Sequence, residues 1–432
     1  MNRPVPPPSG APLRRRPRIA VVGSGAAGLG AVWGLHGKAD TVLYEAEAQP
    51  GGHALTIDVG GAQPVPVDMG FIVYNQLNYP QLDSLFKTLK VPTAPSSMGF
   101  SVTAPNEGFA WAWRGKRYPA SWWCVATNAR RRRLFRDILT FNAKAPSALK
   151  AGTIDPAATL DDFLKEAGFS DAFARHYILP LVGAIWSMPL TGARRFPAAK
   201  LFAFFESHRL FNIMTPRWRT VRGGSRAYVS RLLEHAAPDV RLKTPVAAIR
   251  READGATLTD GAGNADRFDA VILATHPDRA LAGLADPSPA EREALGAIAM
   301  DDNRAILHTD PTTMPTARHN WAPWNATVGA DEGHLPLTYF MNALQPLATR
   351  QPLFVTLNPA REPAGALHET RFRHLQYNHA AVAAQAKVKA MSGAQRTWYC
   401  GAWLGFGFHE DAFAAGLEAA NGALSATVLT LA

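Results

Sequence analysis

Short apolar runs that end at glycine are the first regularity along the chain. Ile19–Val22 is an uninterrupted apolar run, typical of a buried parallel strand, and an alanine-rich helical pattern follows it. Thr41–Tyr44 predicts a second strand. Further strands are predicted at Val240–Leu242, Pro245–Ile249, Phe268–Ala274 and Trp398–Trp403. Buried strands that alternate with helices predict an α/β fold with a parallel sheet.

The turn after the first run has the composition of a phosphate-binding loop. In Gly23-Ser24-Gly25-Ala26-Ala27-Gly28, the first glycine allows a tight turn, the second a close approach to a pyrophosphate, and the third helix–strand packing. The helix that follows directs free N–H groups and a positive dipole end at the phosphates. Glu45 lies about 20 residues further on, where an acid binds a ribose hydroxyl and repels a 2′-phosphate. The segment therefore predicts a dinucleotide site.

A second glycine turn follows the ribose acid, in Gln49-Pro50-Gly51-Gly52-His53. An NAD-binding domain does not need this turn. Together with Glu45-Ala46, the Gly51-Gly52 pair resembles the signature of the FAD-dependent amine-oxidase superfamily, in which the backbone passes close to the cofactor here. The resemblance implies FAD as the cofactor and a two-domain flavoprotein fold of the amine-oxidase and glutathione-reductase type.

The same resemblance extends to three later segments. It implies that Gly70 and Phe71 lie beside the flavin, that Val246 lies near the adenine, and that a run ending in Ala274-Thr275 returns the chain to the nucleotide domain. At the C-terminal strand, Gly401, Ala402, His409, Glu410 and Asp411 are expected at the flavin edge and ribityl chain. Amine oxidases usually carry an acid where this sequence has Ala402, so the ribityl contact differs from theirs.

Some motifs resemble one branch of that superfamily. They are Val67–Asn75, Trp218–Ser225, Asn342–Gln345, Leu357–Pro359 and Gly407–Asp411. The branch comprises bacterial FAD-binding proteins whose genes lie beside cyclopropane-fatty-acid synthase-like methyltransferases. The resemblance implies a lipid or acyl-chain substrate, a neighbouring methyltransferase, and desaturation of methyl-branched unsaturated chains toward furan fatty acids.

The distance between the motifs predicts a discontinuous FAD domain of residues 18–77, 216–300 and 395–432. Residues 78–215 and 301–394 lack nucleotide motifs and are rich in large apolar side chains, which predicts a substrate-binding lobe. Residues 1–17 form a proline- and arginine-rich segment that is expected to be a disordered tail.

Few polar side chains are candidates for the chemistry. They are Tyr74, Asn75, Trp321, Asn325, Tyr339, Asn342, Gln345 and His409. Tyr74, Asn342 and His409 are retained as catalytic candidates, and a structural hydrogen bond is the alternative for each. His409 stands out because it follows the C-terminal glycine turn, where an imidazole could take a proton after hydride loss.

Composition narrows the function classes. The 432 residues are 47% hydrophobic and 19% charged, as in ordinary globular proteins. Cys124 and Cys400 have no metal-binding spacing, so neither a disulfide nor a zinc site is expected, and a reducing cytoplasmic compartment is indicated. No apolar stretch is long enough to span a membrane. The net charge of +10 comes with no nucleic-acid-binding module, so nucleic acid is not the expected partner.

The positive charge is concentrated between Arg114 and Lys150. Trp122-Trp123, Arg130–Arg133 and Arg136 accompany an apolar pattern that includes Leu134, Ile138 and Phe141. Tryptophan beside arginine is typical of a lipid headgroup layer, so the segment Ser121–Lys150 predicts peripheral binding to an anionic membrane surface. The alternative is a helix packed on the core with a solvated basic face.

These observations predict an FAD-dependent oxidoreductase. Together with the resemblance, they predict a fatty-acyl desaturase or dehydrogenase that acts on membrane phospholipids by hydride transfer to flavin. Two alternatives remain open. One is an FAD-dependent amine or polyamine oxidase, which needs a cage for a cationic amine. The other is a flavin-fold lipid-binding partner of a methyltransferase that performs no turnover.

Overall fold

The apolar run Ile19–Val22 lies at the centre of a five-stranded parallel sheet. A computed structural model describes residues 15–113, 129–211 and 216–430 of the chain. The strand order is β10 (Asp239–Arg241), β2 (Asp40–Tyr44), β1 (Arg18–Val22), β14 (Ala270–Leu273) and β20 (Thr397–Tyr399). Every residue of β14 is buried, as expected for a strand covered on both faces. The predicted tail lies outside the described residues up to residue 14.

Helices cover this sheet, and two of them form its closest packing. α1 (Ala26–Leu35) and α15 (His409–Thr430) lie against each other with backbones in near contact. A Cβ on Gly416 would lie 2.0 Å from the Ala27 carbonyl oxygen, and one on Gly30 would lie 2.3 Å from the Phe413 carbonyl oxygen. The small residues of both helices therefore permit a separation that larger side chains would forbid. The other helices of this lobe include α10 (Arg226–Ala236), α11 (Pro277–Gly283), α12 (Pro289–Gly296) and α14 (His379–Met391).

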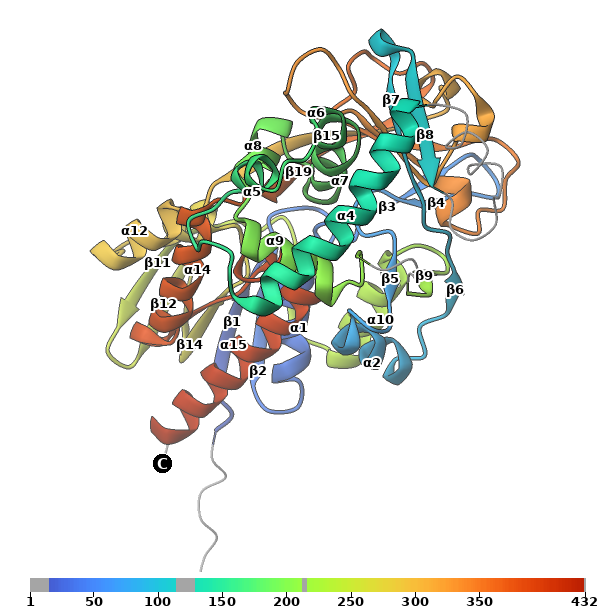
Figure 1. Cartoon of the computed structure of the whole chain (residues 1–432). Helices are drawn as coiled ribbons and strands as arrows, with labels where there is room; N and C mark the ends of the chain where they lie inside the picture. Colours follow the sequence, from blue (N-terminus) through green and yellow to red (C-terminus); the bar gives the residue numbers. More distant parts are fainter. Residues whose placement is uncertain (1–14, 114–128, 212–215, 431–432) are drawn as a thin grey trace, which may run out of the picture.

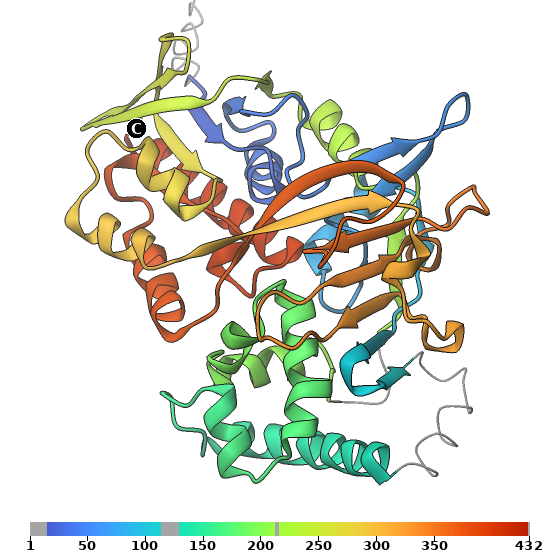
Figure 2. The same cartoon turned by 90° about the horizontal axis from the view of Figure 1, so that it is seen from above.

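A seven-stranded sheet forms the second lobe. Its order is β19 (Ala366–Leu375), β15 (Met300–His308), β18 (Phe354–Leu357), β17 (Leu337–Phe340), β16 (Trp324–Thr327), β7 (Phe100–Ala104) and β8 (Phe109–Trp113). Its neighbours are antiparallel except β16 and β7. The long strands β15 and β19 run from the nucleotide lobe into this sheet (Figures 1 and 2). They therefore connect the two lobes.

Short sheets and a helical layer complete the architecture. β11 (Val246–Glu252), β12 (Gly255–Asp260) and β13 (Ala265–Phe268) form an antiparallel sheet, β3 (Thr56–Val59) pairs with β4 (Val65–Asp68), and β9 (Trp218–Val221) lies between β5 (Tyr74–Asn75) and β6 (Thr93–Pro95). The helices of the second lobe are grouped on one side of its sheet in Figure 2. They are α4 (Ala129–Ala151), α5 (Leu160–Glu166), α6 (Asp171–Phe173), α7 (Leu179–Trp186), α8 (Leu190–Arg194) and α9 (Ala198–Ser207), while the short α13 (Met341–Leu344) directly follows β17.

The division into lobes differs from the sequence division at two helices. α2 (Pro80–Thr88) and α14 were assigned to the substrate lobe, but they pack against α15 and α12 of the nucleotide lobe. Glu410 of α15 accepts hydrogen bonds from the backbone N–H groups of Gln81 and Leu82 at the start of α2. Neither helix carries a nucleotide motif, so sequence motifs could not place them.

The apolar face of α4 packs on the core. Phe141 is fully buried and contacts rings from three neighbouring segments, at Phe163, Phe169, Phe173, Phe202, Phe205 and Phe211. Leu134 is also buried, whereas Leu139 is 48% exposed. The apolar pattern that suggested a lipid-facing helix therefore mainly serves packing. Trp122 and Trp123 lie outside the described residues.

Candidate cofactor site

The carboxyl ends of β1, β2 and β14 meet the start of α15 around a cavity of about 730 Å³. Such an edge of a parallel sheet is where α/β proteins bind their ligands. The second lobe closes the cavity with Ile185 and Trp186 of α7 and with residues 373–375 of β19. The cofactor residues predicted from the sequence that line it are Gly23, Gly25, Ala26, Ala27, Glu45, Ala46, Gly52, His53, Val246, Ala274, Thr275, Gly401, Ala402 and His409.

The three glycines of the first turn have different surroundings. Gly23 has a φ of +99°, and a Cβ there would lie 2.8 Å from the Ala274 carbonyl oxygen. A Cβ on Gly28 would lie 1.8 Å from the Gly23 carbonyl oxygen, so this glycine permits helix–strand packing. A Cβ on Gly25 would meet no protein atom within 4 Å and would point into space beside the cavity. Only the middle glycine thus leaves room that a ligand can use.

Glu45 is held in place by the same turn. Its Oε2 accepts hydrogen bonds from the Ser24 N–H at 2.9 Å and the Ser24 hydroxyl at 2.5 Å. Its Oε1 accepts one from the Glu47 N–H at 2.9 Å. The Ser24 hydroxyl oxygen accepts in turn from the Gly51 N–H at 3.1 Å. Ser24 therefore joins the predicted ribose acid to the second glycine turn, a role that the sequence did not reveal.

The second glycine turn lies directly on the first. Gly51 and Gly52 have φ values of +124° and +56°, in the region that favours glycine. A Cβ on Gly52 would lie 3.0 Å from the Gly25 Cα. Gly51 instead faces Ala54 and Val229 and does not line the cavity. Of this pair, Gly52 reaches the site and Gly51 shapes the turn.

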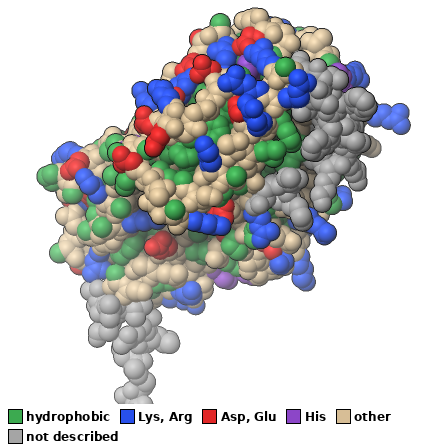
Figure 3. Space-filling view, in the orientation of Figure 1, with side chains coloured by type: hydrophobic (Ala, Val, Ile, Leu, Met, Phe, Trp, Pro, Cys, Tyr) green, Lys and Arg blue, Asp and Glu red, His purple; other side chains and the backbone are tan. Residues whose placement is uncertain are grey.

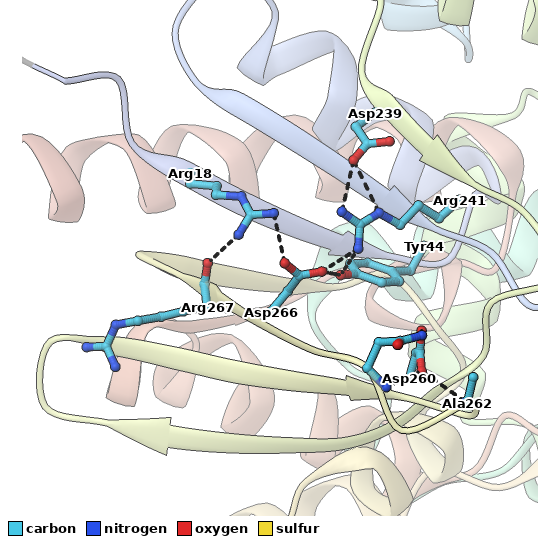
Figure 4. Close-up of polar contacts among 9 residues, drawn as sticks. Arg18, Tyr44, Asp239, Arg241, Asp260, Ala262, Asp266 and Arg267 are labelled. Carbon is cyan, nitrogen blue, oxygen red and sulfur yellow. Dashed lines mark hydrogen bonds and ion pairs between the residues drawn. The ribbon is translucent and has the colours of Figure 1, made fainter.

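An ion-pair network fixes the strand that carries Glu45 (Figure 4). Asp266 of β13 binds Arg18 of β1 and Arg241 of β10, and its Oδ2 accepts from the Tyr44 hydroxyl at 3.1 Å. The Arg241 guanidinium holds the pKa of Asp266 below its usual value. Arg241 also donates to the Tyr44 hydroxyl at 2.8 Å. The side chain of Tyr44, which lines the cavity, is therefore fixed from two strands.

Two buried polar atoms in the cavity wall have no hydrogen-bond partner in the part of the chain that the structure describes. They are Thr275 Oγ1 and His374 Nδ1. Buried polar atoms are normally hydrogen-bonded, because an unsatisfied one costs about 1–3 kcal/mol. Both atoms are shielded even in the open cavity, so they do not mark the place of a ligand. The feature that fits a dinucleotide is the glycine cradle, with its open space at Gly25.

Three histidines meet in the same wall. The His53 ring centroid lies 5.3 Å from that of His374 and 6.3 Å from that of His276. Burial lowers the pKa of His374 to about 4, and burial with repulsion from its neighbours lowers the pKa of His53 further below its usual value. The cluster is therefore neutral near pH 7. His276 and His374 carried no sequence signal, because β14 and β19 bring them together only in the fold.

His409 is the first residue of α15 and lies between two aromatic side chains. Its ring stacks on Phe71, with centroids 3.8 Å apart and planes at 6°. Its Nε2 lies 2.5 Å from the Tyr228 hydroxyl. Burial lowers the pKa of His409 to about 3, so the ring is neutral and a weak base. The proposed role as a general base is therefore disfavoured, and a role as a neutral hydrogen-bonding group is favoured.

Several predicted site residues do not line the cavity, because they have structural partners. Glu410 binds the start of α2, and Asp411 accepts from the Phe408 N–H at 2.9 Å. Phe71 reaches the site only through His409. A Cβ on Gly70 would lie 2.5 Å from the His53 carbonyl oxygen, so this glycine serves backbone packing. Ala402 lines the cavity, and the carboxylates that line it among the described residues are Glu45 and Glu47.

Two catalytic candidates also have structural roles. Tyr74 is 2% exposed and packs edge-on against Tyr79 and Phe86. Asn342 closes a loop, because its Oδ1 accepts from the Leu353 N–H at 2.8 Å and its Nδ2 donates to the Gln351 carbonyl at 3.0 Å. Neither lines the cavity. A polar residue in a family motif was thus not sufficient to predict a place at the site.

Asp68 is a buried acid that sequence reasoning treated only as part of a motif. It accepts from the Ser225 N–H at 2.7 Å and the Thr56 hydroxyl at 2.6 Å, and its Oδ2 accepts from Gln345 Nε2 at 2.7 Å. Burial raises the pKa of Asp68 to about 6. Because Gln345 belongs to the second lobe, the Asp68 carboxyl links the two lobes, two residues before Gly70 in the chain.

The fold and the site define a flavoprotein of the two-lobed dinucleotide-binding class. The chain belongs to the flavin-containing amine oxidoreductase family, whose sequence pattern matches residues 27–329. It is therefore an FAD-dependent oxidoreductase, as the cofactor prediction expected. A comparison with curated protein sequences gave no match.

Solved structures extend the likeness to nearly the whole chain. A CLA-producing fatty acid isomerase from P. acnes has 16% identity and a TM-score of 0.67, over 93% of this chain and 97% of that chain. Cyclohexylamine oxidase from Brevibacterium oxydans has 13% identity and a TM-score of 0.67, over 95% and 99%. Putrescine oxidase bound to putrescine has 15% identity and a TM-score of 0.66, over 94% and 98%. At these identities the likeness establishes the fold.

Proposed function

We propose that FAD lies along the cavity with its adenosine end at Glu45 and Val246 and its flavin end at Gly401, Ala402 and His409. The pyrophosphate would lie at Gly25 and the start of α1, where N–H groups and the helix dipole favour an anion. Bound FAD supplies hydride-accepting chemistry, and the protein supplies orientation and exclusion of water.

The proposed substrate is an acyl chain rather than an amine. The observation that carries this proposal is the charge of the cavity wall. Its carboxylates among the described residues are Glu45 and Glu47, both at the proposed ribose end, and its arginines are Arg279 and Arg373, of which Arg373 is paired with Asp278 and Asp302. The wall at the flavin end is apolar, with Ile185, Trp186, Phe408 and Trp403. A cationic polyamine has no counter-charge there, while a hydrocarbon chain needs none.

The finer proposal is desaturation of methyl-branched unsaturated chains in membrane phospholipids. It rests on the resemblance to the methyltransferase-associated branch, and the fatty acid isomerase among the structural relatives is consistent with an acyl ligand on this fold. In such a reaction a neighbouring methyltransferase would supply the branched chain. Trp186 and Phe408 would exclude water, and neutral His409 would donate a hydrogen bond at the cofactor.

The test is anaerobic mixing of the yellow holoenzyme with candidate substrates while the flavin absorbance is followed. Methyl-branched unsaturated phospholipid should bleach the band, unbranched saturated phospholipid should not, and neither putrescine nor cyclohexylamine should. Bleaching by the amines alone would replace the proposal with amine oxidation. Full FAD content with lipid binding but no bleaching by any of them would favour the non-catalytic lipid-binding partner.

We also propose that a cytoplasmic enzyme of this kind reaches its lipid by binding peripherally to the anionic inner face of a membrane. No helix in the described parts of the chain is long and apolar enough to cross a bilayer. Basic side chains gather over the first turns of α4 (Figure 3), where Arg132, Arg133 and Arg136 are exposed. Arg130 is partly committed to Glu107, so it contributes less. Each cation near an anionic surface contributes about 1 kcal/mol.

Liposome sedimentation tests this surface. Anionic vesicles should bind the protein at low salt and release it at 1 M salt, where screening shortens to roughly 3 Å. The variant Arg132→Ser, Arg133→Ser, Arg136→Ser should lose binding, and the control Lys387→Ser, Arg396→Ser in the nucleotide lobe should keep it. Equal binding of the two variants would exclude this surface.

A further inference from the structure

The hydroxyl of Tyr228 has one hydrogen-bonding neighbour in the described structure. Tyr228 lies in α10 and is completely buried, so its O–H must find an acceptor within the protein. The neighbour is Nε2 of His409, at 2.5 Å. Burial raises the pKa of Tyr228 above its usual value, so the phenol keeps its proton. The same burial keeps the imidazole of His409 neutral.

A neutral pair of this kind can share its protons in only one way. If Nε2 carried the imidazole proton, it would donate to the phenol oxygen, and the phenol O–H would be left buried without an acceptor. If the phenol donates, Nε2 accepts and no buried donor is wasted. The second arrangement places the imidazole proton on Nδ1. The neighbour below the ring, Phe71, offers no competing acceptor.

The Nδ1 atom of His409 faces the cavity. His409 lines the cavity, and its Nδ1 atom has no hydrogen-bond partner among the described residues and is not shielded from solvent. Nδ1 is therefore accessible, and the cavity is the space that reaches it. The ring also stands at the start of α15, where the helix dipole already favours negative charge.

We propose that Tyr228 is a positioning residue that holds His409 as the Nδ1–H tautomer, so that a fixed neutral donor points into the cavity at the flavin end. The proposal depends on FAD in the cavity and not on the identity of the substrate. Because negative charge accumulates on the flavin when it is reduced, a fixed donor beside it stabilises the reduced form more than the oxidised form. Tyr228 then raises the flavin midpoint potential without touching the cofactor.

The first measurement is the midpoint potential of Tyr228→Phe, which removes the hydroxyl and keeps the buried ring. The potential should fall by about 30 mV, equivalent to a tenfold change in the ratio of reduced to oxidised flavin for a two-electron couple. The midpoint potential of His409→Phe, a variant that keeps the stack on Phe71, should fall by at least as much. His409→Asn should retain most of the wild-type potential, because its amide can donate from near the Nδ1 position. Tyr79→Phe is the matched control, since Tyr79 is a buried tyrosine beside Phe71 that does not contact His409.

The second measurement is the tautomer itself, by ¹⁵N NMR of histidine-labelled protein, with the His409 signal assigned from its loss in His409→Phe. The wild type should show a protonated Nδ1, and Tyr228→Phe should show a mixture. An Nε2–H tautomer in the wild type, or an unchanged potential in FAD-loaded Tyr228→Phe, overturns the proposal. The NMR measurement tests the tautomer even in protein that contains no FAD. Failure of the wild type to bind FAD would refute the cofactor assignment and not the tautomer.

Discussion

The turn region around Gly23–Gly28 and the aromatic region around Phe141 are built by opposite means. In the first, side chains are absent or small, so backbone segments contact one another and border the cavity directly. In the second, rings from α4, α5, α6 and α9 pack against one another. The contrast implies that the first region carries binding and the second carries stability. Substitutions can separate the two properties.

The largest expected effect is the loss of FAD from Gly25→Val. A valine there meets no protein atom nearby, so the protein should fold, but its side chain occupies the space next to the cavity. Purified variant should be colourless, with a thermal midpoint equal to that of wild-type apoprotein. Gly296→Ala, also in open space but remote from the cavity, should stay yellow. A yellow Gly25→Val protein would place the pyrophosphate elsewhere.

Phe141→Ala tests the other side of the comparison. Truncation of a fully buried ring removes its packing and leaves a cavity, at a cost of about 3–5 kcal/mol in the free energy of unfolding. Urea titration should measure this loss, while the FAD content per folded chain stays at the wild-type level. Loss of flavin from protein that remains folded would mean that the aromatic region controls the cofactor site directly.

Acid should weaken the fold, because burial keeps two histidines neutral. Burial lowers the pKa of His208, which stacks on Phe204 at the end of α9, to about 4, as it does for His374 at the cavity. The unfolded state therefore binds more protons than the native state between about pH 6.5 and 4, and stability falls as the pH falls through that window.

His208→Phe should flatten this pH dependence by up to about 3 kcal/mol between pH 7 and pH 4, while keeping the stack on Phe204. Asp68, whose pKa is raised to about 6, acts in the opposite direction, so the difference between variant and wild type is the quantity to measure. Parallel unfolding curves for the two proteins at every pH would contradict the prediction.

The smallest expected effect is that of Glu45→Gln. Loss of a charge-assisted hydrogen bond to the ribose should weaken FAD binding by about 1–3 kcal/mol and leave the aromatic region unaffected. Equilibrium titration of apoprotein with FAD measures it. Glu47→Gln is a control in the same wall, because the Glu47 side chain makes no recorded hydrogen bond to the turn. Equal FAD affinity of Glu45→Gln and wild type would move the ribose away from Glu45.

Sequence reasoning succeeded where local backbone chemistry decides the structure. The turn at Gly23–Gly28 needs its glycines whatever the rest of the chain does, so the strand, the helix and the cavity edge could be predicted from a few residues. The FAD assignment followed from two such turns in succession.

Sequence reasoning failed where distant segments of the chain determine the role of a side chain. Glu410 had the position of a cofactor ligand, but the start of α2 takes its carboxylate. Asn342 had a promising motif, but a loop of its own lobe uses its amide. Tyr228 had no motif, and yet its hydroxyl faces His409 from a helix 181 residues away along the chain. None of these pairings leaves a periodic trace in the sequence.

The close packing of α1 against α15 has a consequence for biosynthesis. The central strand of the nucleotide sheet leaves the ribosome early, but β20 and α15 follow only after residues 397–430 have been made. At about 5–20 residues per second, the glycine-lined face of α1 waits many seconds for its partner. During that interval the nascent chain exposes an apolar helix face and an unpaired strand edge, and the flavin end of the site does not yet exist. Cofactor capture is therefore expected only after α15 has been synthesised.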